Sequence, residues 1–326
     1  MQLFKLSVVL VIAEVLAVFA FGAVLGPVLA QMAGMTLQNP LQILQQQPDA
    51  PLLPLAVDLA VLLGWQYLGW GLCAVILFWL RPVRERKRTA HVPQMSRGWL
   101  TLVACALIAI PAVALTQAQE IWHFGSRAPW FDILQQRSWD WQFWLFTAVG
   151  SFALIPVLEE LFYRGFMLNR LAGGWQNGPA VLLTSVLFAC SHAQYLQTDW
   201  FNLLMLVNVG FVGLVLALAT LYSGSLWPAI FAHALINLPM QPVAAGFILL
   251  LSCGVLCAGW RHWTDFRLYI RAQLGSLSLS QLLLAVGLGV GFALLFHRAA
   301  LYLAIVAAPF WLVLVVYRIW QRRHQV

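Results

Sequence analysis

Residues 154–168 read Leu-Ile-Pro-Val-Leu-Glu-Glu-Leu-Phe-Tyr-Arg-Gly-Phe-Met-Leu, an apolar run that contains two adjacent acids. Apart from Glu159, Glu160 and Arg164, this segment has the composition of a membrane-spanning helix. A charged side chain at the centre of a bilayer costs at least about 2.5–3.5 kcal/mol, so acids at this depth need compensating partners. The segment therefore predicts a membrane helix that carries a buried polar site.

The composition of the whole chain agrees with a membrane protein. Of its 326 residues, 62% are hydrophobic and only 9% are charged, and the mean hydropathy is +0.83. A soluble domain usually carries about a quarter charged residues. We therefore predict an all-α polytopic membrane protein. The net charge of +7 does not indicate a nucleic-acid partner, because the basic residues cluster at helix ends, as the positive-inside rule expects.

Hydropathy predicts about ten transmembrane helices. With the N-terminus inside, fourteen Lys and Arg residues fall on the inner side and three on the outer side, so both termini are expected inside. The predicted spans are 6–30, 52–80, 99–118, 141–168, 179–196, 201–222, 226–239, 243–259, 281–296 and 300–317.

The two acids are expected to differ in role. Consecutive helical residues point about 100° apart, so Glu159 and Glu160 cannot share one environment. Glu160 can pair with Arg164 one turn later. Glu159 has no cation nearby in the sequence and is a candidate general base. Pro156 removes a backbone hydrogen bond and could kink the helix there. The alternative is a structural, ion-paired helix junction.

Two further apolar runs each contain one histidine. Phe188 and His192 are four residues apart, as are His233 and Asn237, so each pair lies on one helix face. His233 and Asn237 together could donate hydrogen bonds to one oxyanion. Alternatively, each histidine could be a packing residue, and Asn237 could simply end its helix.

A metal site is the main chemical alternative. Glu159, His192 and His233 could ligate a divalent ion, but the pattern His-Glu-x-x-His is absent. We therefore favour general-base catalysis without a cofactor and keep a divalent metal as an alternative. Among other polar residues in spans, Glu14 and Asp58 are expected to be structural, and Asn202 and Asn208 to hydrogen-bond between helices.

The three polar segments resemble the motifs of the CPBP family of intramembrane proteases, the CAAX protease and bacteriocin-processing (Abi) proteins that include the Ras-converting CAAX endopeptidase. Those motifs are EExxxR, FxxxH and HxxxN/D on three helices. They stand here as Glu159-Glu160-Leu-Phe-Tyr-Arg164, Phe188-Ala-Cys-Ser-His192 and His233-Ala-Leu-Ile-Asn237. The resemblance covers about residues 145–240.

This resemblance implies an intramembrane endopeptidase that acts on a membrane-associated peptide or protein, in a bacterial inner membrane. Glu159 and His192 would activate water, and His233 and Asn237 would form the oxyanion site. Glu160, Arg164 and Phe188 would organise the site. It also implies an eight-helix core followed by a C-terminal helical hairpin. We divide the chain into 1–140 with spans one to three, 141–260 with the catalytic core, and 261–326 with the hairpin.

Two questions remain open at this point. A proton-coupled transporter could use the same intramembrane acids as a relay. The predicted boundaries also place Glu159 toward the inner end of its span and His192 nearer the outer end of the next. At about 1.5 Å per residue, this difference in depth could exceed about 10 Å.

Overall fold

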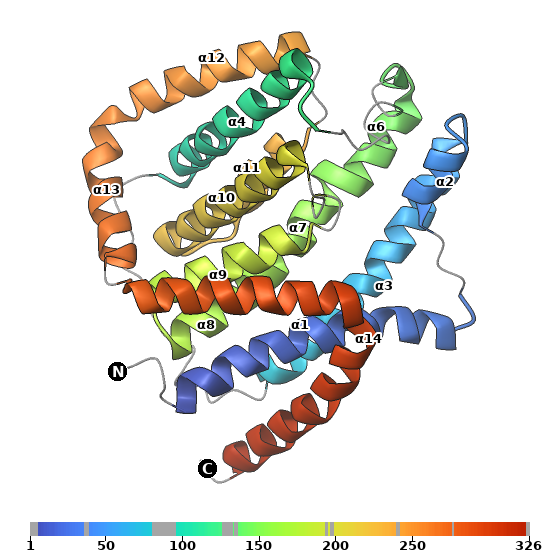
Figure 1. Ribbon diagram of the computed structural model, residues 1–326, viewed down its shortest axis with the longest axis vertical. Coiled ribbons are helices and arrows are strands. Elements are labelled where there is room, and N and C mark those ends of the chain that lie inside the picture. The colour runs from blue at the N-terminus through green and yellow to red at the C-terminus, as the bar shows by residue number, and fades with distance from the viewer. Residues whose placement is uncertain are drawn as a thin grey trace.

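The computed structural model describes residues 6–35, 39–79, 96–125, 133, 136–192, 195, 199–238, 242–275 and 277–323. Within these ranges every regular element is a helix (Figure 1), which confirms the predicted all-α class. The basic cluster at 81–88 that supports the predicted orientation lies outside the described residues.

The helices follow the predicted order along the chain. The first four are α1 (Leu6–Met32), α2 (Pro40–Gln46), α3 (Leu52–Trp79) and α4 (Arg97–Trp122). The fourth span is built from α6 (Trp141–Thr147), η3 (Ala148–Phe152), α7 (Leu154–Glu160), η4 (Leu161–Leu168) and α8 (Asn169–Gly174). The remaining helices are α9 (Asn177–Cys190), α10 (Trp200–Ser223), α11 (Trp227–Ile236), α12 (Pro242–Ala258), α13 (Trp260–Leu274) and α14 (Leu279–Arg323).

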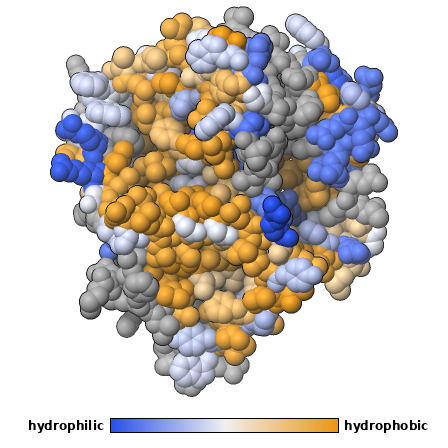
Figure 2. Space-filling view, in the orientation of Figure 1, coloured by the Kyte–Doolittle hydropathy of each residue, from blue (hydrophilic) through white to orange (hydrophobic). Residues whose placement is uncertain are grey.

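Several of these helices are long and apolar enough to cross a bilayer. In the described part of the chain there are six, or seven if the pair 246–258 and 262–274, bent by 89°, counts as one span. The shorter apolar helices 177–190, 227–236 and 279–292 correspond to three further predicted spans. Hydrophobic side chains also cover much of the face seen in Figure 2. The protein is thus an integral, multi-pass membrane protein, and the total of ten spans stays a prediction.

The fourth span departs from a regular α-helix around the acid pair. The π-helical segments η3 and η4 flank the short α7, which contains Pro156 and both glutamates. At Ala153 the backbone has φ −114° and ψ −67°. Proline cannot donate the usual backbone hydrogen bond, and π-helical turns are frequent at functional sites. The expected irregularity before Glu159 is therefore present.

The fourth span is also longer than predicted, which removes the expected difference in depth. It continues through α8 to Gly174, and α9 begins at Asn177 after a short turn. Fifteen residues separate Glu159 from Gly174, and fifteen separate Asn177 from His192. At about 1.5 Å per residue, both side chains lie about 22 Å from the turn. The boundary predicted at residue 168 was wrong, and Glu159 and His192 lie at similar depth.

A buried ion pair explains why the fourth span continues. Glu14 of α1 accepts two hydrogen bonds of 2.7 Å, from Nε and Nη2 of Arg170. Both side chains are buried. Such a bidentate pair compensates the charge that would otherwise end an apolar helix. Glu14 therefore has the predicted structural role, whereas Asp58 is exposed on α3.

Helices α1 and α3 pack closely because glycines line their crossing. Gly22 and Gly26, spaced as Gly-x-x-x-Gly, lie on α1, and Gly69 faces them from α3. A Cβ atom on Gly69 would overlap the backbone of both α1 glycines. Small residues allow this kind of backbone approach in membrane helices. The crossing fixes α3 beside the fourth span, which it also contacts.

Substituting Gly69 by alanine should therefore destabilise the protein. The added methyl group meets backbone rather than a movable side chain, so we expect a loss of about 1–3 kcal/mol. Gly71→Ala on the same helix is the matched control, since no heavy atom lies within 4 Å of a Cβ built there. Thermal unfolding in detergent would measure both variants. Equal stability of the two would argue against the close crossing.

The C-terminal α14 packs against α1 and α9. Its two halves are separated at Ala299, where φ is −149° and ψ is 39°. Figure 1 shows a sharp bend within α14. Ala299 lies next to the turn predicted at His297 and Arg298. The division of the chain into three regions remains a prediction.

Candidate active site

The centre of the polar site is the predicted pair of Glu160 and Arg164. Arg164 Nη1 donates to Glu160 Oε1 at 2.6 Å, and both side chains are fully buried. His233 of α11 contributes a third group, because its Nδ1 lies 2.9 Å from the same Oε1. A carboxylate only accepts hydrogen bonds, so His233 Nδ1 carries the proton. Glu160 therefore fixes both the tautomer and the orientation of this imidazole.

Arg164 also connects the site to α10. Its Nη2 donates to the backbone oxygen of Gly213 at 3.0 Å. A Cβ on Gly213 would lie 3.1 Å from Ser185 Cα and 3.2 Å from Phe188 Cδ1. The absence of a side chain at this position therefore lets α10 approach both α9 and the guanidinium group.

Phe188 joins the two histidines. Its ring centroid lies 4.8 Å from that of His192 and 5.7 Å from that of His233, with edge-on geometry in both cases. The Arg164 guanidinium lies 4.4 Å from the same ring, a cation–π contact. His192 follows the end of α9, and its Nδ1 donates to the Phe188 carbonyl at 2.8 Å. The His192 Nε2 atom therefore remains available as a proton acceptor.

Glu159 is oriented differently from its neighbour, as predicted from the helical geometry. Its Oε1 accepts a hydrogen bond of 3.3 Å from the Tyr67 hydroxyl of α3. Its Oε2 lies 3.8 Å from His233 Nε2, and this buried oxygen has no hydrogen-bond partner among the described residues. Buried polar atoms normally have a partner, so an unpaired one indicates a position where a ligand or water binds.

Asn237 lies at the C-cap of α11, close to the irregular part of the fourth span. Its Nδ2 donates to the Ser151 carbonyl at 3.1 Å, and the Ser151 hydroxyl donates to the Asn237 carbonyl at 3.1 Å. One amide hydrogen of Asn237 is thus used to join α11 to η3. The oxyanion role of Asn237 stays a prediction.

The structure therefore brings most of the predicted residues together. Glu159, Glu160, Arg164 and His233 are connected by direct contacts, and Phe188 places His192 next to them. Glu159 and His192 make no direct hydrogen bond within the described residues. The sequence interpretation missed Tyr67, Ser151 and Gly213, which belong to no motif.

The alternative set of metal ligands comprises Glu159, His192 and His233. In the ranges that the structure describes, no group of three or more His, Cys, Asp or Glu side chains is arranged to hold a metal ion. Metal binding by Glu159, His192 and His233 stays an alternative prediction; His233 lies near Glu159, and Phe188 contacts both histidines.

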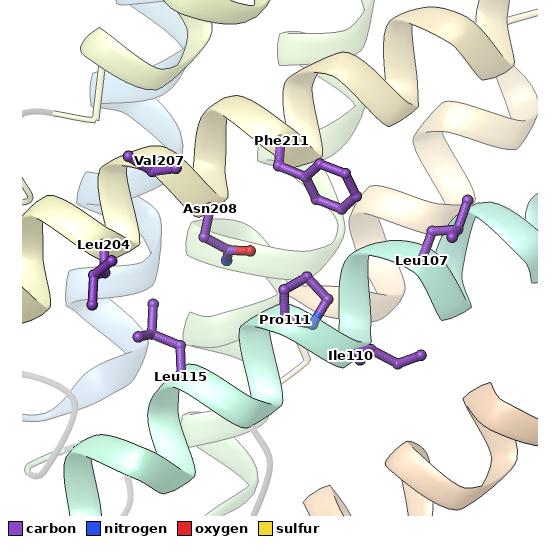
Figure 3. A pocket seen from close by; sticks show the side chains of 8 residues that line it. All are labelled: Leu107, Ile110, Pro111, Leu115, Leu204, Val207, Asn208 and Phe211. Carbon is purple, nitrogen blue, oxygen red and sulfur yellow. The ribbon is translucent and has the colours of Figure 1, made fainter. Parts of the chain in front are cut away.

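A separate groove of about 500 Å³ lies between α4 and α10 (Figure 3). None of the motif residues lines it. Asn208 is its one polar side chain, and its buried Oδ1 has no hydrogen-bond partner among the described residues, so the interhelical hydrogen bond predicted for it stays a prediction. Asn202 donates to Asp199, the N-cap of its own helix, and the interhelical hydrogen bond predicted for it stays a prediction. The groove lining comprises Leu107, Ile110, Pro111, Leu115, Leu204, Val207, Asn208 and Phe211.

Comparison with known proteins agrees with the predicted family resemblance. Residues 139–239 match the family model described as type II CAAX prenyl endopeptidase Rce1-like, a range that includes all three motifs. The chain is also 36% identical over 91 residues to an uncharacterized 24.3 kDa protein of Escherichia coli. That alignment covers 27% of this chain and 40% of the relative. No solved structure matches the chain.

The matched region contains the buried acid pair, both histidines and the asparagine, and it lies within apolar helices. Residues 139–239 of the chain are thus similar to the CAAX-type membrane proteases of the CPBP family, as the three motifs predicted.

Proposed function

We propose that the protein is an intramembrane endopeptidase that hydrolyses a peptide bond of a membrane-associated peptide or protein. The observation that carries this proposal is the arrangement of Glu159, whose unpaired Oε2 is buried near one imidazole, with a second imidazole against the same phenyl ring. Such an arrangement can bind a water molecule in a sheltered site and accept its proton.

In the proposed reaction, Glu159 takes a proton from water, and the free Nε2 of His192 helps to orient that water. The water oxygen bonds to the carbonyl carbon, and the carbonyl electrons move to its oxygen. The second amide hydrogen of Asn237 and His233, which in this proposal carries a proton on Nε2 as well as on the Nδ1 that is bonded to Glu160, stabilise the resulting oxyanion. When the oxyanion collapses, the C–N bond breaks and Glu159 returns the proton to the leaving amine.

Glu160 and Arg164 have a supporting role in this proposal. Glu160 accepts hydrogen bonds from both Arg164 and His233 through one oxygen atom. The Arg164 charge compensates the buried Glu160 charge, so that Glu160 can fix the His233 ring. The two adjacent glutamates thus serve different functions, one reacting with water and the other orienting an imidazole.

The matched family model names a CAAX prenyl endopeptidase, and this name gives the first substrate to test. The purified protein, reconstituted in liposomes, would be incubated with a quenched fluorescent peptide that ends in a farnesylated CAAX sequence and with its unprenylated counterpart. Cleavage of either peptide supports the proposal. Proton-linked solute flux without cleavage of either peptide would contradict it and favour the transporter.

In this assay His192→Ala is expected to reduce kcat by about 10²-fold, because a positioned acid–base group contributes about that much. His297→Ala is the matched control: His297 also bonds to a backbone carbonyl near α9, that of Cys190, but lies on α14. We expect the control to retain most of the activity. Similar rates for the two variants would remove His192 from the proposed mechanism.

A further inference from the structure

We infer that Tyr67 is a positioning residue that fixes the Glu159 carboxylate for its reaction with water. This inference rests on the proposed function and adds a residue from outside the matched region 139–239. Tyr67 lies in α3, which carries none of the three motifs. Among the described residues it is the one side chain that donates a hydrogen bond to Glu159.

The two oxygens of the Glu159 carboxylate face different partners. Tyr67 binds Oε1, which leaves Oε2 on the side of His233. Without that bond, a carboxylate at the end of a flexible side chain could rotate away from this orientation. The Tyr67 bond is 3.3 Å long, and hydrogen bonds in catalytic sites often shorten only when substrate binds. The hydroxyl therefore fixes the orientation of the carboxylate, with one oxygen toward the imidazole.

The Tyr67 ring is held in place by the aromatic side chains around it. It packs edge-on against Trp70, with the centroids 5.0 Å apart. Trp70 in turn stacks on Phe162 at 4.6 Å, with the ring planes within 7° of parallel. The Trp70 indole nitrogen also donates to the Phe19 carbonyl of α1 at 3.0 Å. Both Trp70 and Phe162 are buried, so this aromatic group cannot rearrange easily.

Helix α3 and the fourth span each present two of these residues on the face where they meet. Tyr67 and Trp70 are three residues apart on α3, and Glu159 and Phe162 are three residues apart on the fourth span. Residues three apart lie on one helix face. The stacking of Trp70 on Phe162 therefore fixes the axial position and the rotation of α3 against the fourth span. As a consequence, the Tyr67 hydroxyl reaches the Glu159 carboxylate.

The test is Tyr67→Phe, which removes the hydroxyl and leaves the aromatic packing in place. We expect kcat to fall about tenfold on the peptide that the wild-type protein cleaves, with KM changed by less than about twofold. Tyr269→Phe on α13 is the matched control, since its ring also packs edge-on against another aromatic ring, that of Tyr222, and belongs to no part of the proposed site. The control should keep the wild-type kcat.

A double variant distinguishes loss of carboxylate positioning from a general structural effect of the Tyr67 substitution. Glu159→Asp shortens the side chain by one methylene and withdraws the carboxylate from Tyr67. Adding Tyr67→Phe to this variant should change kcat by less than about twofold, because the bond is already lost. A further tenfold loss in this background, or wild-type kcat in the single variant, would overturn the inference. The proposed function would fail separately, if Glu159→Gln left turnover unchanged.

Discussion

Substituting Glu159 by glutamine is expected to reduce peptide turnover by about 10³-fold or more. Glutamine has nearly the same shape, and it can still accept the hydrogen bond from Tyr67, but it cannot take a proton from water. Because Glu159 is not part of the Arg164 ion pair, the variant should fold and insert normally. The initial rate of cleavage in liposomes and the thermal unfolding temperature in detergent would be measured on the same preparation.

Asp58→Asn provides the matched control for this variant. Asp58 is also an acid in a predicted membrane span, but it is exposed on α3 and belongs to no motif. Its substitution should leave turnover within about twofold of wild type. A Glu159→Gln protein that retained the wild-type rate would show that this carboxylate is not the base.

Substituting Arg164 by methionine is expected to destabilise the protein by about 3–5 kcal/mol. The substitution leaves the fully buried Glu160 without its cation and removes the hydrogen bond to Gly213 on α10. It also removes the cation–π contact between the guanidinium group and the Phe188 ring. The free energy of unfolding, measured by titration with sodium dodecyl sulfate in mixed micelles, would show the loss.

The double variant Glu160→Leu with Arg164→Met distinguishes the charge effect from lost packing. Replacing a whole buried ion pair by apolar residues is often close to neutral, whereas removing one partner is strongly destabilising. The double variant should therefore recover most of the stability. It should remain inactive, because His233 has lost the carboxylate that orients it. A double variant as unstable as Arg164→Met would mean that shape, rather than charge, accounts for the loss.

Much of the site could be predicted from the sequence because its key contacts are local. The spacing of four residues placed Arg164 against Glu160, and the same spacing placed Phe188 against His192. Adjacent helical residues point about 100° apart, and this geometry predicted that Glu159 and Glu160 face different surroundings. These inferences need only the helical repeat, and no knowledge of how the helices pack.

The contacts that escaped prediction all join distant parts of the chain. Neither spacing nor composition indicates that His233 bonds to Glu160, or that Tyr67 bonds to Glu159. The predicted end of the fourth span failed for a related reason. Arg170 looks like the start of a polar loop, but Glu14, more than 150 residues earlier, pairs with it and lets the helix continue.

The most direct test of the account is peptide hydrolysis in water enriched in oxygen-18. Wild-type protein in liposomes would be incubated with the farnesylated peptide, and the products would be analysed by mass spectrometry. We predict one oxygen-18 atom in the newly formed carboxyl terminus, and at least about 10³-fold less of this product with Glu159→Gln. Labelled product formed equally fast by the variant would contradict water activation by Glu159.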